Sequence, residues 1–585
     1  MTTTDDRPEH VVADGTARRL GPRVWLCRGL YVLLLVVLAK ALYPFTALPI
    51  TWDELLYMGV AYMPEPQTCA LNRYTHIYLL SLLMWLADDP YRGARILWCL
   101  AVAGSFAALV WCTAPLRAPL RALVLLTTTL LLLSQDVGAW TLGIAYTDYT
   151  VMLIITLSAA LILPSILRGQ PIAVASAFGL GLLFVFGLRA KEVSLVLGVL
   201  APVLWIQPGA GLRPTRAGAA RLGAYVAGGA LALGVLLALD GWLLGDAGFL
   251  LRAESWRALL AFNQVAGRYE STLNWLGWML RPENFTAFFL YAASVPVLAA
   301  RMRDLRLVLV FLIPLLYFLQ LIATFATGNS LVVARYALPV LPLMCFAAAF
   351  AAGRLLEQTA SGPRARAVVL WTGAALAAAG LVFVLLGHGR FLWPADHRFL
   401  HEVVFPGTVF GAVVLLALAA AGPPRWRAPL GLLTFALLCG SALPPALRVT
   451  HEAANLQLKR YADNRFHDLR CLARRLPAGP DTRFLVAADL YDRQLAERGP
   501  WAFRALLAMG TRTRLRADQI TIAEDLPARP ADELRAYDYV VASPDTARGL
   551  LARLADGPAA AAPWELLAGP RSEVSVLRRV GPSRP

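Results

Sequence analysis

Two adjacent carboxylates, Asp53 and Glu54, follow directly on the first long apolar stretch of the sequence. A charged side chain near a bilayer core costs roughly 3 kcal/mol on insertion scales, so two of them side by side indicate a function. A carboxylate at a membrane surface can take a proton from a hydroxyl group, and we expect Asp53 to be such a general base. In a helix Glu54 points to a different side, which suits the positioning of a loop or of an acceptor.

Three cations stand at the ends of other apolar stretches and could hold an anion. Arg189 and Lys191 are separated by one residue, and Arg335 precedes a tyrosine. An arginine presents a planar fork that can bind two phosphate oxygens, whereas a lysine supplies a point charge. For each of them, snorkelling of a long side chain to the membrane interface is the alternative interpretation. Glu192 is expected simply to pair with Arg189 or Lys191.

The elements that position these residues are membrane spans. Of the 585 residues, 58% are hydrophobic and 16% charged, and the mean hydropathy of +0.58 is well above that of a soluble domain. A helix needs about 20 apolar residues to cross a bilayer. About thirteen windows qualify, several of them short: 29–49, 94–113, 121–135, 149–164, 171–188, 193–207, 222–244, 285–300, 306–325, 331–353, 367–387, 406–421 and 428–447.

Basic residues gather in alternate loops, which sets the expected orientation. Loops with arginines, for example at 117–121, 213–221 and 301–306, are expected to face the cytoplasm. The loops between them are poorer in cations and are expected outside; they contain Asp53, Glu54, Glu65, Asp136 and Asp148. Most of the net charge of +16 comes from the short connecting loops and the C-terminal tail. An anionic lipid surface is therefore the expected partner, not nucleic acid.

Beyond residue 450 the pattern becomes that of a small α/β domain. Short apolar runs at 484–488, 520–522, 539–542 and 574–577 alternate with helical stretches. We therefore expect a cytoplasmic N-terminal tail, a multi-pass α-helical domain with a catalytic first outer loop, and an extracytoplasmic α/β domain. Their ranges are 1–28, 29–449 with the loop at 50–93, and 450–585.

Two outer loops contain further candidates. In the first, the apolar stretch Ile77–Ala87 is too short to span a bilayer and reads as a helix lying in the interface. In the loop at 388–405, His397 and His401 are spaced to share one face of a helix and could bind a metal. A solvated polar loop is the interpretation we favour there, so the metal site stays unknown and a divalent metal cofactor stays open.

Four motifs, in this order, resemble those of the GT-C glycosyltransferases, in particular the branch of protein O-mannosyltransferases and lipid A aminoarabinose transferases. They are Trp52–Tyr57 (like D-E-x-x-Y), Asn72–Leu82 with Pro90–Leu97, Tyr146–Asp148, and Arg335–Pro339 (like R-Y-x-x-P). The chain departs from the family at Asn72–His76, where relatives often have His-Pro-Pro before the interfacial helix.

The resemblance implies an enzyme of the plasma (inner) membrane that moves a sugar from a polyprenyl-phosphate donor to an acceptor hydroxyl at the outer face, with undecaprenyl or decaprenyl phosphate as carrier in a bacterium. Asp53 is then the base. Acceptor or loop positioning falls to Glu54, Tyr57, His76 and Asp148, and donor phosphate binding to Arg189, Lys191, Arg335 and Tyr336. For Asp148 the alternatives are contact with Arg189, contact with the sugar, or capping of its helix.

A multi-span transporter or flippase for a lipid-linked or small polar substrate is the main alternative. Such proteins show internal repeats and interrupted helices with polar residues at mid-membrane, and we find no internal repeat. A catalytically silent scaffold is a further alternative, for which the acidic pair is dispensable. The sequence does not specify the sugar, the acceptor (protein, lipid or glycan), the metal requirement or the oligomeric state.

Overall fold

The computed structural model describes most of the chain from residue 52 onward, and for some residues only the backbone. The described ranges are 52–62, 73–135, 146–206, 215–252, 286–301, 304–326, 334–387, 405–460, 464–479, 481–490, 507–508, 510–511, 513, 515, 517–555, 563–569 and 573–580.

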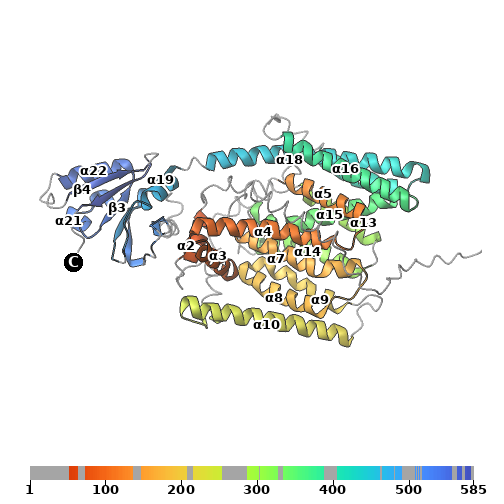
Figure 1. Ribbon diagram of the computed structural model, residues 1–585, viewed down its shortest axis with the longest axis horizontal. Helices are drawn as coiled ribbons and strands as arrows, with labels where there is room; N and C mark the ends of the chain where they lie inside the picture. Colours follow the sequence, from red (N-terminus) through yellow and green to blue (C-terminus); the bar gives the residue numbers. More distant parts are fainter. Residues whose placement is uncertain are drawn as a thin grey trace, which may run out of the picture.

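Long helices packed side by side form the main body of the molecule (Figure 1). The α-helices are α2 Trp52–Tyr62, α3 Tyr74–Ala87, α4 Pro90–Cys112, α5 Ala118–Leu133, α7 Thr147–Leu167, α8 Val174–Ala190, α9 Leu200–Trp205, α10 Arg216–Leu244, α13 Thr286–Arg301, α14 Leu305–Ala326, α15 Leu341–Gln358, α16 Pro363–Gly387, α17 Phe405–Ala421 and α18 Pro424–Arg460. Three 3-10 helices, η3 Glu192–Val199, η4 Phe249–Leu251 and η5 Ala334–Val340, lie between them.

Each predicted apolar window from residue 94 onward coincides with a helix or with a 3-10 helix that leads into one. Seven of the described helices are long and apolar enough to cross a membrane, and the others are shorter. The first window, 29–49, lies outside the described residues, so the predicted total of thirteen spans stays a prediction.

The short helix α3 has the apolar surface expected of an interfacial helix. Its outer face exposes Leu82, Trp85 and Leu86, while the opposite face is buried. The turn into α4 is tight: Asp88 adopts a left-handed backbone, and the Asp89 carboxylate accepts hydrogen bonds from the amides of Tyr91 and Arg92. Because this carboxylate caps α4, the acidic pair 88–89 is explained by the turn itself.

Helix α8 ends where the candidate cations begin. Its last residue is Ala190, and Lys191 takes an extended backbone before the 3-10 helix η3 starts at Glu192. The change of direction sends Arg189, Lys191 and Glu192 to different neighbours. Helix α10 packs along α8 with the two backbones in direct contact at Gly181 and Gly228, where any side chain would overlap a main-chain carbonyl.

The C-terminal part contains a five-stranded mixed sheet in the order β2-β1-β3-β5-β4. Strand β1 is parallel to β2 and β3, and β5 is antiparallel to β3 and β4. The strands are β1 Phe484–Ala487, β2 Ile520–Ala523, β3 Tyr539–Ala542, β4 Trp564–Ala568 and β5 Ser575–Arg579, and the helices include α19 Asn464–Ala473, α21 Ala531–Leu534 and α22 Pro544–Ala555. Four strands match predicted apolar runs, and β4 was not predicted.

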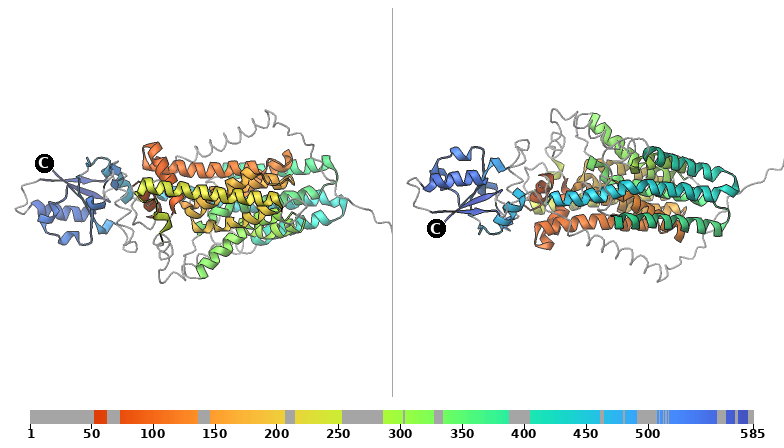
Figure 2. Two further views of the ribbon diagram at one scale, coloured as in Figure 1. Left: turned by 90° about the horizontal axis from the view of Figure 1, so that it is seen from below. Right: turned by 90° about the horizontal axis from the view of Figure 1, so that it is seen from above.

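The sheet lies beyond the end of the helical body at which α2 and α3 are found (Figures 1 and 2). One apolar cluster contains residues of α2 and α3 together with residues of α19, β1 and β3. Helix α18 runs without a break across residue 450, where the sequence pattern predicted the start of the C-terminal domain, and ends at Arg460. The two regions predicted to lie outside the membrane thus occur at the same end of the molecule.

Candidate active site

The predicted base, Asp53, lies in the first turn of α2, next to Glu54. The side chains of both residues lie outside the described part. Four positions after Asp53, the Tyr57 ring meets the His76 ring edge to face, with ring centroids 5.3 Å apart. This contact fixes α2 against α3 and brings two of the predicted positioning residues together.

His76 is fully buried between α3 and α7. Its Nδ1 lies 2.9 Å from the hydroxyl oxygen of Thr150, one turn into α7. The neighbouring hydroxyl and the ring of Tyr57 hold the imidazole in a fixed orientation. His76 therefore links the acidic helix α2 to the helix that carries Asp148.

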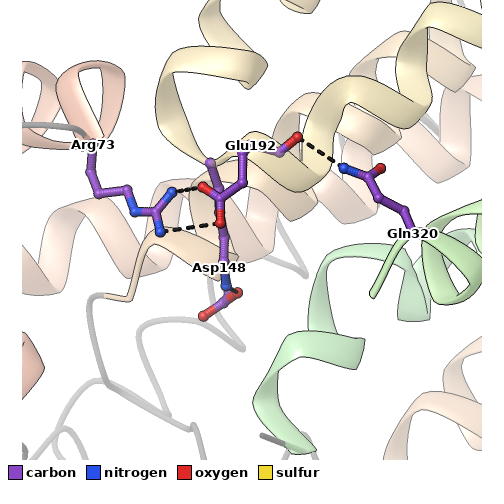
Figure 3. Close-up of polar contacts among 5 residues, drawn as sticks. Arg73, Asp148, Glu192 and Gln320 are labelled. Atoms are coloured by element: carbon purple, nitrogen blue, oxygen red, sulfur yellow. Dashed lines mark hydrogen bonds and ion pairs between the residues drawn. The ribbon is translucent and has the colours of Figure 1, made fainter. Parts of the chain in front are cut away.

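Arg73, at the start of α3, forms an ion pair with Glu192 (Figure 3). Besides a shorter contact to Oε2, its second guanidinium nitrogen lies 3.4 Å from Glu192 Oε1. Burial acts to raise the pKa of Glu192, but the Arg73 guanidinium outweighs it and lowers the pKa to about 2. The same pairing outweighs the effect of burial on Arg73 and raises its pKa. The pair is charged at neutral pH and clamps the start of η3 to α3.

Two further contacts come from α14, one to the backbone of η3 and one to that of η5. The Gln320 amide of α14 donates to the Glu192 carbonyl oxygen at 3.1 Å, and Figure 3 shows the two side by side. The Tyr317 hydroxyl, one turn earlier on α14, donates to the Tyr336 carbonyl oxygen at 2.7 Å. Helix α14 therefore tethers both η3 and η5, the two 3-10 segments that carry predicted phosphate-binding residues.

Lys191 and Asp148 form a second ion pair, which is almost completely buried. Lys191 Nζ lies 2.5 Å from Asp148 Oδ1, and the two side chains are 4% and 2% exposed. The same ammonium lies 3.6 Å above the centre of the Tyr336 ring, a cation–π geometry. Three predicted site residues from α7, the end of α8 and η5 thus come together.

One expectation about these pairs is corrected, and one alternative for Asp148 is excluded. Glu192 was expected to pair with Arg189 or Lys191, but it pairs with Arg73, because the extended backbone at Lys191 turns it toward α3. Asp148 was expected to contact Arg189 or the sugar or to cap its helix. The N-cap residue of α7 is Tyr146, and the carboxylate of Asp148 binds Lys191, while contact of Asp148 with Arg189 or with the sugar stays a prediction.

Arg189 belongs to a neighbouring cluster on α3, α8 and α10. Its guanidinium carbon lies 4.6 Å from the centre of the Tyr74 ring. One turn further along α3, the Tyr78 hydroxyl donates to the carboxylate of Asp240, which is fully buried in α10. The sequence signal for Asp240 was its position as an isolated acid inside a span, whereas nothing in the sequence singled out Arg73 or Gln320.

An apolar groove of about 1030 Å³ opens beside these clusters. It is lined by side chains of α3, α4, α7, α8 and α10, among them Leu79, Leu153, Leu183, Phe186 and Leu239, and its polar lining includes Tyr78 and Thr150. At its edge stand Trp85 and Trp242, which are 72% and 77% exposed. Exposed tryptophans are typical of headgroup depth, so the groove has the composition of a site for a lipid chain.

The remaining candidates fall outside the described side chains. Arg335 lies in η5, but its side chain is not described, and the loop with His397 and His401 is not described either. Within the described ranges there is no group of three or more His, Cys, Asp or Glu residues that could hold a metal ion.

Comparisons with known proteins find solved structures alone. No family model and no curated protein matches the chain. One neighbour is ArnT from Cupriavidus metallidurans bound to undecaprenyl phosphate, with a TM-score of 0.48, 15% identity and coverage of 96% of this chain and 100% of that one. Its apo state gives a TM-score of 0.49 at 15% identity over 94% and 99%.

Another neighbour is the oligosaccharyltransferase AglB from Archaeoglobus fulgidus in complex with an inhibitory peptide and a dolichol-phosphate, with a TM-score of 0.41, 10% identity and coverage of 95% of this chain and 75% of that one. At such identities and TM-scores the matches assign no role to any residue here, and the roles below rest on the site's own geometry. ArnT, a lipid A aminoarabinose transferase, and AglB both belong to the GT-C superfamily, the group that the four sequence motifs resemble.

Proposed function

We propose that this chain is a membrane glycosyltransferase that moves a sugar from a polyprenyl-phosphate donor to an acceptor hydroxyl at the outer face of the membrane. The observation that carries the proposal is the position of the apolar groove. It meets the buried polar clusters of α3, α7, α8 and α10 at the end of the molecule where α2 carries the acidic pair. A lipid-linked donor can enter such a groove from the plane of the membrane.

In this mechanism Asp53 takes the proton of the acceptor hydroxyl while the oxygen of that hydroxyl attacks the anomeric carbon of the sugar. The bond between that carbon and the phosphate oxygen breaks, and the leaving polyprenyl phosphate keeps the electron pair. Cations near the phosphate stabilise the charge that develops on it in the oxocarbenium-like transition state. The proton ends on Asp53, and the sugar ends on the acceptor.

The phosphate contacts are divided unequally among the proposed cations. Lys191 is already neutralised by Asp148, so it reaches a phosphate only by sharing its charge between two anions. Arg189 lies against the Tyr74 ring beside the groove and is also within electrostatic reach of the Asp240 carboxylate. Because Lys191 is already paired, we assign Lys191, Tyr336 and Asp148 mainly to positioning and keep Arg189 and Arg335 as the proposed phosphate-binding cations.

The test is sugar transfer by the purified full-length protein with a panel of polyprenyl-linked sugars. Asp53→Asn removes the base and keeps the size of the side chain, so we expect transfer to fall by at least about 100-fold. Glu54→Gln is the matched control, with a smaller loss. Full activity of Asp53→Asn would contradict the assigned base, and absence of transfer with every donor would favour the transporter or flippase alternative.

The donor site has a separate test. Arg335→Ala is expected to raise the apparent KM for the lipid donor, because a phosphate contact made in the ground state is lost. An unchanged KM would count against this role for Arg335.

Orientation is tested by cysteine labelling in a background without native cysteines. Ala247 is exposed just beyond α10, at the end expected to face outside, and Ala175 is exposed in the first turn of α8, at the opposite end. We expect an impermeant thiol reagent added to intact cells to label Ala247→Cys and to spare Ala175→Cys. The reverse pattern would place the candidate site in the cytoplasm.

A further inference from the structure

Two arginines are buried at the opposite end of the helical body, near the starts of α10 and α14. Arg221 of α10 is 2% exposed and Arg306 of α14 is 1% exposed. Burying an ionised side chain without a counter-charge costs several kcal/mol, so buried arginines normally lie against carboxylates. The partners of these two arginines therefore show whether the buried positive charges in this region are compensated.

Arg306 has a complete set of partners. Its Nε and one terminal nitrogen bind the two carboxylate oxygens of Asp304 at 3.1 and 2.8 Å, and the other terminal nitrogen donates to the Gln170 carbonyl oxygen at 2.8 Å. The backbone amide of Arg306 also donates to Asp304, at 3.0 Å. Both oxygens of the Asp304 carboxylate are thus bound by Arg306.

Arg221 has no such set. Its Nε and one terminal nitrogen are buried and have no hydrogen-bond partner in the structure. The charged residue that acts on it is Arg306, which repels it. This region of the described chain thus has two buried guanidinium groups and one carboxylate bound by Arg306, which leaves the positive charge of Arg221 uncompensated.

The register of α8 and α10 relates the start of α8 to Arg221. Helices α8 and α10 run side by side in the same direction: Phe178 touches Gly228, and further along Phe186 and Leu239 line the same groove. Followed back toward the helix starts, this register sets Arg221 level with the first turn of α8. No side chain caps that turn at its N-cap residue Ala173, and its first residues are exposed. Its amide groups are open to an anion.

We propose that a phosphate group binds here, between α8, α10 and α14, with the free nitrogens of Arg221 and the first amides of α8 as its donors. A phosphate supplies the negative charge that the two arginines lack, and its oxygens suit the fork of a guanidinium. The group could belong to the headgroup of an anionic phospholipid or to a soluble phosphate. The site lies at the end expected to face the cytoplasm and does not depend on the proposed transferase activity.

The experiment measures the thermal unfolding midpoint of the full-length protein in a neutral detergent, with three additions: a short-chain phosphatidylglycerol, the matching phosphatidylcholine, and inorganic phosphate at constant ionic strength. We expect phosphatidylglycerol to raise the midpoint by about 3 °C and phosphatidylcholine to leave it unchanged. An equal rise with inorganic phosphate would identify a soluble ligand. Absence of a rise with either anion would overturn the proposal.

Two variants of α10 locate the effect. Arg221→Gln is expected to abolish the anion-dependent rise, whereas Arg216→Gln, with the same change of charge at an exposed position of α10, keeps it. An equal rise in both variants would mean general attraction of anions and would overturn the site. If Arg221→Gln does not fold, Arg221→Lys serves in its place: it keeps the charge but has no fork, so we expect a smaller rise than in the unmodified protein.

Discussion

The two ends of the helical body hold buried charges in different proportions. At the end with the candidate active site, Arg73 pairs with Glu192 and Lys191 pairs with Asp148, so cations and anions balance. At the other end, Arg306 alone binds Asp304, and two buried nitrogens of Arg221 have no hydrogen-bond partner. A balanced cluster needs no ligand and can hold segments in place, whereas an unbalanced one stabilises the protein fully only when an anion joins it. The difference separates positioning residues from binding residues without reference to any substrate.

The largest loss of stability is expected when one charge is removed from the most buried ion pair. Lys191→Met leaves the Asp148 carboxylate buried without its cation, which we expect to destabilise the protein by about 3–5 kcal/mol. The double variant with Asp148→Leu removes both charges and should recover most of this loss. Thermal unfolding in detergent measures both effects. A single variant as stable as the unmodified protein would show that the pair does not hold α7 and α8 together.

A smaller loss of stability is expected when the excess of buried positive charge at the other end is increased. Asp304→Asn leaves two buried guanidinium groups without a carboxylate, and because Asp304 is itself 31% exposed we expect a loss of about 1–3 kcal/mol. Saturating phosphatidylglycerol or phosphate should reduce the difference from the unmodified protein. If the anion stabilises both proteins equally, the two arginines do not share a ligand.

The contribution of the Arg73–Glu192 ion pair to the stability of the protein depends on pH. The pKa of Glu192 is lowered from its ordinary 4.5 to about 2, so its contribution to stability is fully present above about 4.5 and is lost as the pH falls toward 2. We expect the unfolding midpoint of Glu192→Gln to lie below that of the unmodified protein at pH 6 and to approach it between pH 4.5 and 2. A constant difference across this window would rule out titration of Glu192 as the cause.

The sequence predicted the helices well because apolar windows of span length are a strong signal. It also predicted four of the five strands as short apolar runs. Strand β4 was missed because Trp564–Ala568 follows a stretch that reads as a linker and mixes Glu565 with apolar residues. Such an edge strand is set by its pairing with β5, which is a tertiary contact.

Within the site, the sequence identified residues better than partners. His76 lies against Thr150, and Asp148, Lys191 and Tyr336 lie together, while the roles predicted for these residues stay predictions. The predicted partner of Glu192 was wrong because it depends on the direction of one residue, Lys191, whose extended backbone interrupts two helical segments. A pattern of residue types does not contain that dihedral angle.

The smallest effect tests whether an ion pair such as Lys191–Asp148 stabilises the protein because it is buried, and not merely because the two charges are paired. Arg548 and Asp545 of α22 lie 2.6 Å apart, nearly the distance of the Lys191–Asp148 pair, but their side chains are 66% and 93% exposed. Water screens such a pair, so we expect Arg548→Gln to change the free energy of unfolding by less than about 0.5 kcal/mol. The unfolding midpoint at low and at high salt measures this. A loss as large as that of Lys191→Met would mean that contact distance outweighs burial, and the comparison between the two ends would then have to be made on distances alone.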